Sequence, residues 1–118
     1  MTKAEWDALD DENKDGMVAE RVMRWTLDQG AQSLQWIDPN GFGRWMKKDF
    51  KPTTDRNASA LVLDEIDRRN LRIEFEDALS DEGDDPAAFI DARYAIEWAL
   101  RLSPDFICYC AVKAVSDD

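Results

Sequence analysis

The chain has 118 residues, 44% of them hydrophobic, and its net charge is −11 because 26 Asp and Glu outnumber 15 Lys and Arg. This length predicts one domain, residues 1–118, that buries about two-thirds of the surface exposed in the unfolded chain. The sequence has no histidine, which removes the commonest general base and the commonest metal ligand. We therefore expect a non-enzymatic binding protein without a cofactor.

The composition also bears on where the protein works. No apolar run is long enough to span a membrane, and the acidic N-terminus lacks the apolar region of a secretory signal. The two cysteines, Cys108 and Cys110, would point to nearly opposite sides of a helix, which is poor geometry for a disulfide. These features favour the cytoplasm. The negative charge disfavours nucleic acids and anionic membranes as partners.

The first third of the chain predicts helical structure. Residues 2–10 form a short amphipathic turn with Trp6 and Leu9 inward, although residues 1–15 are also compatible with a loosely ordered acidic segment. A break is expected at Asp15-Gly16. A helix then runs from Met17 to about Leu27, ends at Gly30, and buries a stripe made of Val18, Val22 and Trp25.

The middle of the chain predicts a hairpin and a second helix. Ser33–Ile37 is a strand, with Leu34 and Trp36 on one face, and Gly43–Lys47 is the return strand after the turn at Asp38-Pro39-Asn40-Gly41. Thr54 or Asp55 caps a helix that closes at Asn70 in a left-handed conformation. The inward positions of that helix are Ala58, Leu61, Val62 and Ile66.

The last third mixes strand and helix signals. Leu71, Ile73 and Phe75 alternate with polar residues and predict a half-buried strand. Residues 87–102 fit either a strand or a helix, and the alternation favours a strand. Ser103-Pro104 then begins a final helix. The inward positions of this helix are Ile107, Cys110, Ala111 and Ala114. The predicted fold class is α+β, with helices on an antiparallel sheet of four to five strands.

Three segments together resemble the phage ABA-sandwich domain family of small bacteriophage and prophage proteins. They are the helix Met17–Trp25, the helix entry Lys51–Asp55 with Ala58, Ala60, Val62 and Ile66 after it, and Ser103-Pro104 followed by Ile107-Cys108 and Ala111–Val115. The resemblance implies an α-β-α layered sandwich, strands before Ser103, and a phage or prophage protein in the cytoplasm of a bacterial host. It carries no catalytic residues. The chain departs from the family in its acidic central region and at Phe106 and Tyr109.

The acidic residues are concentrated in one segment. Eight carboxylates and no Lys or Arg occur between Ile73 and Asp91. Clustered negative charge opposes folding but attracts basic surfaces. We predict a partner-binding surface made of Glu74, Glu76, Asp77, Asp81, Glu82, Asp84 and Asp85.

The partner expected for this surface is a host or phage protein with a basic surface. The concrete hypothesis is an inhibitor of a host nucleic-acid-binding defence complex, such as an anti-CRISPR or anti-restriction protein, acting by charge mimicry. The alternative is a structural or housekeeping phage protein, which could be a homodimer and whose acidic face only keeps it in solution. A solvated acidic face also accounts for Glu74, Glu76 and Asp77 better than an acid–base pair does.

Two further candidate sites have competing interpretations. Asp11-x-Asn13-x-Asp15-Gly16 resembles the front half of an EF-hand loop, but Val22 stands where calcium needs a bidentate glutamate. The residues Asp11, Asn13 and Asp15 therefore define either a weak calcium-binding module or a helix cap. Trp36, Phe42 and Trp45 form either a secondary aromatic surface or part of the core.

A basic segment from Arg44 to Arg56 interrupts the acidic sequence and includes Trp45 and Phe50. It is a solvated loop, a patch that pairs with the acidic segment of the same chain, or a nucleic-acid contact. Cys108 and Cys110 are expected to be buried core thiols and not nucleophiles, because no histidine is present to serve as a base.

Overall fold

The computed structural model describes residues 1–28, 34–81 and 102–116, and this part of the chain has an α+β fold. Its strands form one antiparallel sheet in the order β1-β2-β3. The elements are α1 (Lys3–Asp7), α2 (Asp11–Met17), the π-helical turn η1 (Val18–Val22), β1 (Thr26–Asp28), β2 (Gln35–Ile37), β3 (Gly43–Met46), α3 (Arg56–Arg68), α4 (Arg72–Asp81) and α6 (Pro104–Val115).

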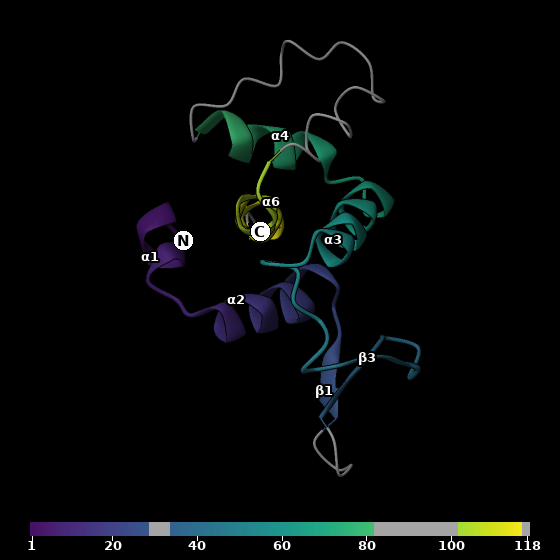
Figure 1. The fold of residues 1–118 in the computed structure, drawn as a ribbon. Coiled ribbons are helices and arrows are strands. Elements are labelled where there is room, and N and C mark those ends of the chain that lie inside the picture. The colour runs from purple at the N-terminus through teal and green to yellow at the C-terminus, as the bar shows by residue number, and fades with distance from the viewer. Residues whose placement is uncertain (29–33, 82–101, 117–118) are drawn as a thin grey trace.

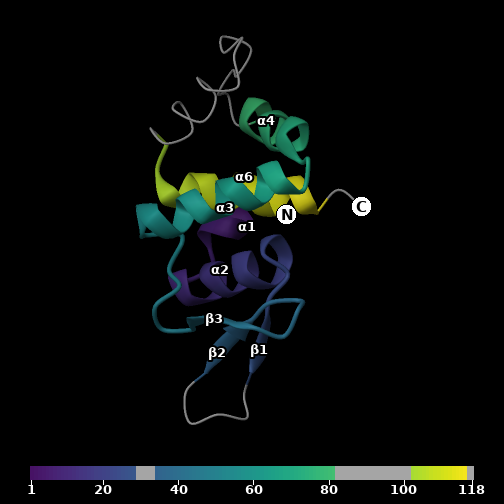
Figure 2. The same cartoon turned by 90° about the vertical axis from the view of Figure 1, so that its right-hand side faces the viewer.

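The elements are stacked along one direction. The sheet lies at one end, α2 lies next to it, α1, α3 and α6 follow, and α4 lies at the other end (Figures 1 and 2). Figure 1 looks along α6, which is surrounded by the other helices. The helices described here lie on one side of the sheet. The expected α-β-α layering is therefore not seen in the described ranges.

Helix α6 is the central element of the core. Ser103 caps it by accepting a hydrogen bond from the backbone N–H of Phe106, and Pro104 begins the first turn, as predicted. Six consecutive residues, Ile107–Val112, are buried. A helix that is buried on every side needs apolar residues all round. The predicted inward positions Ile107, Cys110, Ala111 and Ala114 are confirmed.

The N-terminal segment is packed against α6. Trp6 of α1 is fully buried, and its ring centroid lies 6.0 Å from that of Tyr109. Its Nε1–H donates to Asp105 Oδ1 at 3.2 Å, and Lys14 Nζ donates to the same oxygen at 2.9 Å. Residues 1–15 are thus the helix α1 and most of α2. The predicted inward orientation of Trp6 and Leu9 is confirmed.

The predicted break at Asp15-Gly16 is wrong. Asp10 caps α2, which runs through Gly16 and continues as η1. The helix therefore starts earlier than Met17, and it ends before Leu27 because Arg24 adopts a left-handed conformation with φ 60°. Val18, Val22 and Trp25 are buried as predicted, since a π-helical turn still brings one stripe to the core.

The hairpin agrees with the prediction, although the sheet around it is smaller. β2 and β3 are antiparallel, and Trp36 faces Trp45 across them. The pairing shifts between Trp36 and Ile37, so Arg44 is an extra residue that bulges from β3. Thr26–Asp28, expected to end a helix, instead pairs with β2 as strand β1.

The strand predicted over Leu71–Glu76 is wrong, because all of this stretch except Leu71 belongs to α4. The N–H of Asn70 donates to the carbonyl of Asp67, and that of Leu71 donates to the carbonyl of Ile66, which ends α3 in a Schellman motif. Asn70 has the predicted left-handed φ of 56°, and Asp55 is the cap. In α3, Ala58, Val62 and Ile66 are buried, but Leu61 is exposed.

Helical spacing explains the burial pattern of α4. Phe75, Ala78 and Leu79 are buried against α6, whereas Ile73 is 69% exposed. A strand would have placed Ile73 and Phe75 on the same face. The described sheet therefore lacks the predicted fourth strand. The strand predicted within residues 87–102 lies outside the described residues, apart from Leu102.

We predict that Phe75→Ala and Ile73→Ala will differ sharply in stability. Truncating the buried Phe75 leaves a cavity and should cost about 3–5 kcal/mol of the free energy of unfolding. Truncating the exposed Ile73 should change it by about 0.5 kcal/mol or less. Urea denaturation followed by circular dichroism measures both values, and equal losses would contradict the helical assignment of α4.

Candidate binding surfaces

One candidate surface is the outer side of α4. Its exposed positions are Ile73, Asp77, Ser80 and Asp81, which follow one another at helical spacing. They lie opposite the stripe that α4 buries against α6. The structure thus places an exposed apolar side chain beside carboxylates on α4. Among the described elements, α4 is the one farthest from the sheet (Figure 1).

The predicted acidic residues do not all have the same environment. Glu76 accepts a hydrogen bond from Arg72 Nε at 3.1 Å, and Asp81 forms an ion pair with Lys113 of α6 at 3.0 Å. Glu74 is half-buried beside them, and Asp77 is exposed. The expected row of Glu74 and Glu76 on an exposed strand face is therefore wrong. Glu82, Asp84 and Asp85 lie outside the described residues.

A second candidate surface is a cleft between α2 and the β2–β3 hairpin. The cleft has a volume of about 670 Å³, and a smaller hollow of about 320 Å³ beside β1 shares Glu12, Trp36 and Lys47 with it. Its apolar lining comes from Leu34, Trp36, Met46 and Phe50. Pockets of roughly 300–1,000 Å³ are typical of ligand sites.

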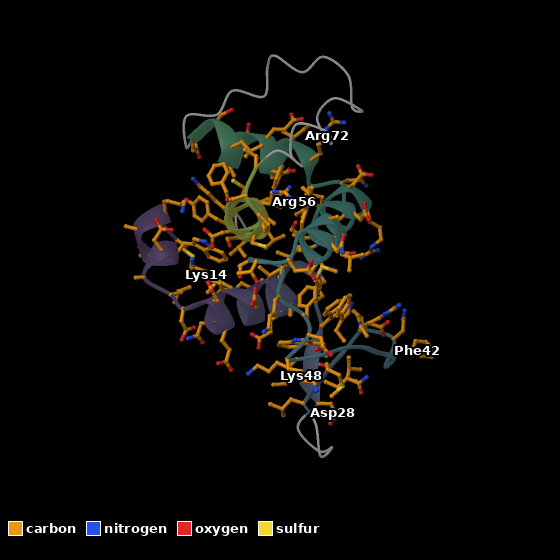
Figure 3. The ribbon with its side chains drawn as sticks, viewed as in Figure 1. Lys14, Asp28, Phe42, Lys48, Arg56 and Arg72 are labelled. Carbon is orange, nitrogen blue, oxygen red and sulfur yellow. The ribbon has the colours of Figure 1, made fainter. Side chains whose placement is uncertain are left out.

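The two long walls of the cleft carry opposite charges. The turn after β3 contributes Lys47, Lys48 and Lys51, and α2 contributes Asp11, Glu12 and Asp15. Lys47 Nζ reaches across to Glu12 Oε1 at 2.9 Å, and this ion pair joins the walls where the two hollows meet. Lys48 and Lys51 are exposed and form no ion pair with another described residue. Figure 3 shows Lys48 beside the hairpin.

Asp15 is built into the structure of the cleft. Its Oδ1 accepts hydrogen bonds from the backbone N–H of Thr53 at 3.0 Å and from Thr53 Oγ1 at 2.7 Å. Burial raises the pKa of this carboxyl, although the two Thr53 donors work in the opposite direction. Asp15 thereby fastens the lysine-bearing turn to α2.

The calcium hypothesis receives no support from this arrangement. Asp15 is turned into the protein toward Thr53, whereas Asp11 and Asn13 are exposed. The helix cap is Asp10, which accepts a hydrogen bond from the N–H of Asn13. Within residues 1–28, 34–81 and 102–116, no three Asp, Glu, Cys or His side chains are grouped closely enough to hold a metal ion.

The three predicted surface aromatics separate from one another. Trp36 is 2% exposed and belongs to the core, and half-buried Trp45 packs on Phe50 with ring centroids 5.8 Å apart. Phe42 is 67% exposed and points away from the helices at the hairpin tip (Figure 3). The interpretation that these three rings form one surface is therefore wrong, because the sheet turns the Trp36 side chain inward.

The hairpin tip that carries Phe42 is held by Asp38. Its carboxylate accepts hydrogen bonds from the N–H groups of Phe42 and Asn40, each at 2.9 Å, and from Arg44 Nε at 2.7 Å. These donors lower the pKa of Asp38, the Phe42 N–H having the largest effect. Arg44 is thus paired within the hairpin. Among the described residues, the basic segment pairs with Asp38 and Glu12 and not with the acidic residues of α4.

The cysteines are poorly suited to nucleophilic chemistry. Cys108 and Cys110 are both buried and are not joined by a disulfide. Burial raises the pKa of Cys108 well above its ordinary value, and the negative charges of Asp15 and Asp105 act in the same direction.

None of the described helices is long and apolar enough to cross a membrane.

Comparisons with protein-family models, curated proteins and solved structures found no match.

The sequence revealed the basic segment but not the cleft. Lys47, Lys48 and Lys51 are visible as a cluster, yet their position opposite Asp11 and Glu12 depends on a contact between segments about 35 residues apart. The local sequence hints at this contact only through Thr53, whose hydroxyl can donate a hydrogen bond. The sequence does not show that Asp15 accepts it.

We predict that Asp15 makes stability depend on pH. Because its pKa is raised in the folded state, the folded protein binds this proton more tightly than the unfolded chain. Asp15 therefore reduces the free energy of unfolding as pH rises from the ordinary value of 3.8 through the raised pKa. Asp15→Asn should gain stability relative to the wild type over this range, as measured by urea denaturation at a series of pH values.

The variant Thr53→Val serves as the control for this pH effect. It removes the hydroxyl that donates to Asp15 and keeps the side-chain shape, so the pKa of Asp15 should rise further. The range of falling stability should then extend to higher pH. A difference between Asp15→Asn and wild type that stays constant with pH would contradict the prediction.

Proposed function

We propose that this chain is a non-enzymatic interaction protein whose acidic α4 surface binds a basic surface on a protein partner. The observation that supports this proposal most is Ile73, which is 69% exposed on a helix that also carries Glu74, Glu76, Asp77 and Asp81. After Arg72, α4 contains no basic residue. An apolar anchor within a charged rim is the usual composition of a protein-binding surface.

The packing of α4 makes this surface suitable for binding. Phe75, Ala78 and Leu79 hold the helix against α6, and Lys113 of α6 pairs with Asp81. The outer face is therefore fixed before a partner arrives, which reduces the entropy lost on binding. Carboxylates that are exposed in this way increase the rate of association with a basic partner, and salt weakens the attraction.

The partner that we propose is a nucleic-acid-binding protein of a host defence system, inhibited by charge mimicry in the cytoplasm of an infected or lysogenic bacterium. Support comes from the net charge of −11 and from the resemblance of three segments to small phage proteins. A basic nucleic-acid channel attracts acidic surfaces by the same long-range electrostatics that attract phosphates. With this origin we also propose the α-β-α layered sandwich of four to five strands.

The proposal predicts that binding depends on the charges of α4. The partner would be isolated from the host by affinity purification, and its dissociation constant would be measured at increasing salt concentrations. The triple variant Glu76→Gln, Asp77→Asn, Asp81→Asn should weaken binding about tenfold or more, and it should also reduce the salt dependence. Ile73→Lys should weaken binding by removing the apolar anchor.

The control for this experiment is a triple variant with the same change in net charge. Glu5→Gln, Glu20→Gln and Asp64→Asn neutralise three exposed carboxylates outside α4. These changes should leave the dissociation constant within about twofold of the wild-type value. Unchanged affinity in the α4 variant, or equal losses in both variants, would overturn the assignment of binding to this surface.

A further inference from the structure

We propose that the cleft between α2 and the hairpin is a second binding site, which takes a peptide segment carrying an acidic side chain next to a bulky apolar one. This proposal does not depend on the function of α4. The elements that line the cleft, α2 and the hairpin, lie toward the sheet end of the described elements, whereas α4 lies at the opposite end (Figure 2). The two surfaces share none of their residues.

The first support for the site is its size and apolar lining. The hollow of about 670 Å³ can hold one large side chain together with the backbone beside it. Leu34 and Met46 are incompletely buried, and Leu34 is 41% exposed. Trp36 and Phe50, which also line the cleft, are buried. A bulky apolar side chain of a ligand would cover this exposed apolar surface.

The second support is a pair of exposed lysines, Lys48 and Lys51, that form no ion pair with a described residue, although the charge of Lys51 acts on Asp15. Most of the ion pairs described in this acidic chain join a lysine or arginine to a carboxylate close in sequence or across the core. Lys48 and Lys51 instead border the cleft without such a partner among the described residues, although carboxylates are present on the opposite wall. An acidic side chain of a ligand could pair with both ammonium groups.

The third support is that the walls are fixed in place. Thr53 binds Asp15, Lys47 binds Glu12, and the Trp25 ring lies 4.8 Å from the Phe50 ring by centroid distance. These contacts attach the lysine-bearing turn to α2 and to Trp25, which follows η1. The backbone that carries the lysines is thus held close to the buried aromatic residues, which favours a ligand whose acidic and apolar groups are near each other.

The opposite wall decides between a peptide and a nucleic acid. Asp11 and Glu12 line the same cleft as Lys48 and Lys51. A nucleic-acid strand carries a phosphate at every nucleotide, so these carboxylates would repel it. A peptide carries its charges one at a time and can place its backbone N–H groups against the carboxylates. The bipolar charge of the cleft therefore favours an acidic peptide.

The experiment uses the full chain and a random dodecapeptide library displayed on filamentous phage. The selected sequences should be enriched in Asp or Glu next to a large apolar residue. Synthetic peptides with these sequences should shift the backbone amide resonances of residues 11–16 and 46–54 in NMR spectra. Selection of basic sequences, or no enrichment after repeated rounds, would overturn the proposal.

Charge reversal then tests the two lysines. The variant Lys48→Glu, Lys51→Glu changes only exposed side chains and should weaken binding of the selected peptides about tenfold or more. The control Arg24→Glu, Arg68→Glu makes the same change in net charge at exposed positions outside the cleft and should leave binding within about twofold. Equal losses in both variants would show a general charge effect and overturn the site.

Two further measurements separate this site from the alternatives. Leu34→Ser should also weaken peptide binding, because the apolar contact is lost. A single-stranded oligothymidylate, tested at the same salt concentration, should not bind; binding that Lys48→Glu, Lys51→Glu abolishes would make the cleft a nucleic-acid site instead. The α4 triple variant should bind the peptides normally, so failure here is distinguishable from failure of the α4 proposal.

Discussion

The burial of α6 is the constraint on which the rest of the described structure depends. A twelve-residue helix with six consecutive buried residues, Ile107–Val112, is stable only when other elements cover it on all sides. Helices α3 and α4 and the turn η1 pack directly on it, and Trp6 of α1 reaches both Tyr109 and Asp105. Asp105 also forms an ion pair with Lys14. Burial disfavours the charged form of Lys14, but this hydrogen bond and the negative charge of Asp105 leave its pKa above the ordinary value.

The two proposed surfaces follow from this arrangement. Because α6 occupies the centre, α4 and the sheet are placed at opposite ends of the described elements (Figure 2), and each carries exposed side chains such as Ile73 and Phe42. At the α4 end the exposed charge is negative, and at the hairpin end it is divided between a lysine wall and a carboxylate wall. A chain with a net charge of −11 can thus offer two chemically different surfaces, since local pairing such as Lys47–Glu12 matters more at short range than net charge does.

The sequence predicted the elements that local signals define. The Ser103 cap, the left-handed Asn70 and the turn that follows Asp38 were correct, and Asp55 is one of the two caps predicted for α3. Each of these features depends on hydrogen bonds within a few residues. The strand predicted over Leu71–Glu76 was wrong for a related reason. Its apolar positions Leu71, Ile73 and Phe75 satisfy a strand period, and only the later Ala78 and Leu79, packed against α6, show that the period is helical. The helix break predicted at Asp15-Gly16 was a similar error, because a glycine inside a helix is tolerated when tertiary packing supports the turn on either side.

By itself, the sequence determined the net charge, the lack of histidine, the concentration of carboxylates after Ile73 and the stripes of Val18, Val22 and Trp25. It could not determine which charges remain available to a partner. That depended on tertiary contacts: Lys113 pairs with Asp81, Glu12 pairs with Lys47, and Lys48 and Lys51 stay beside an apolar cleft. The physical reason is that pairing and burial depend on the distance between atoms. Residues 12 and 47 become neighbours only when the hydrophobic core brings α2 and the hairpin together.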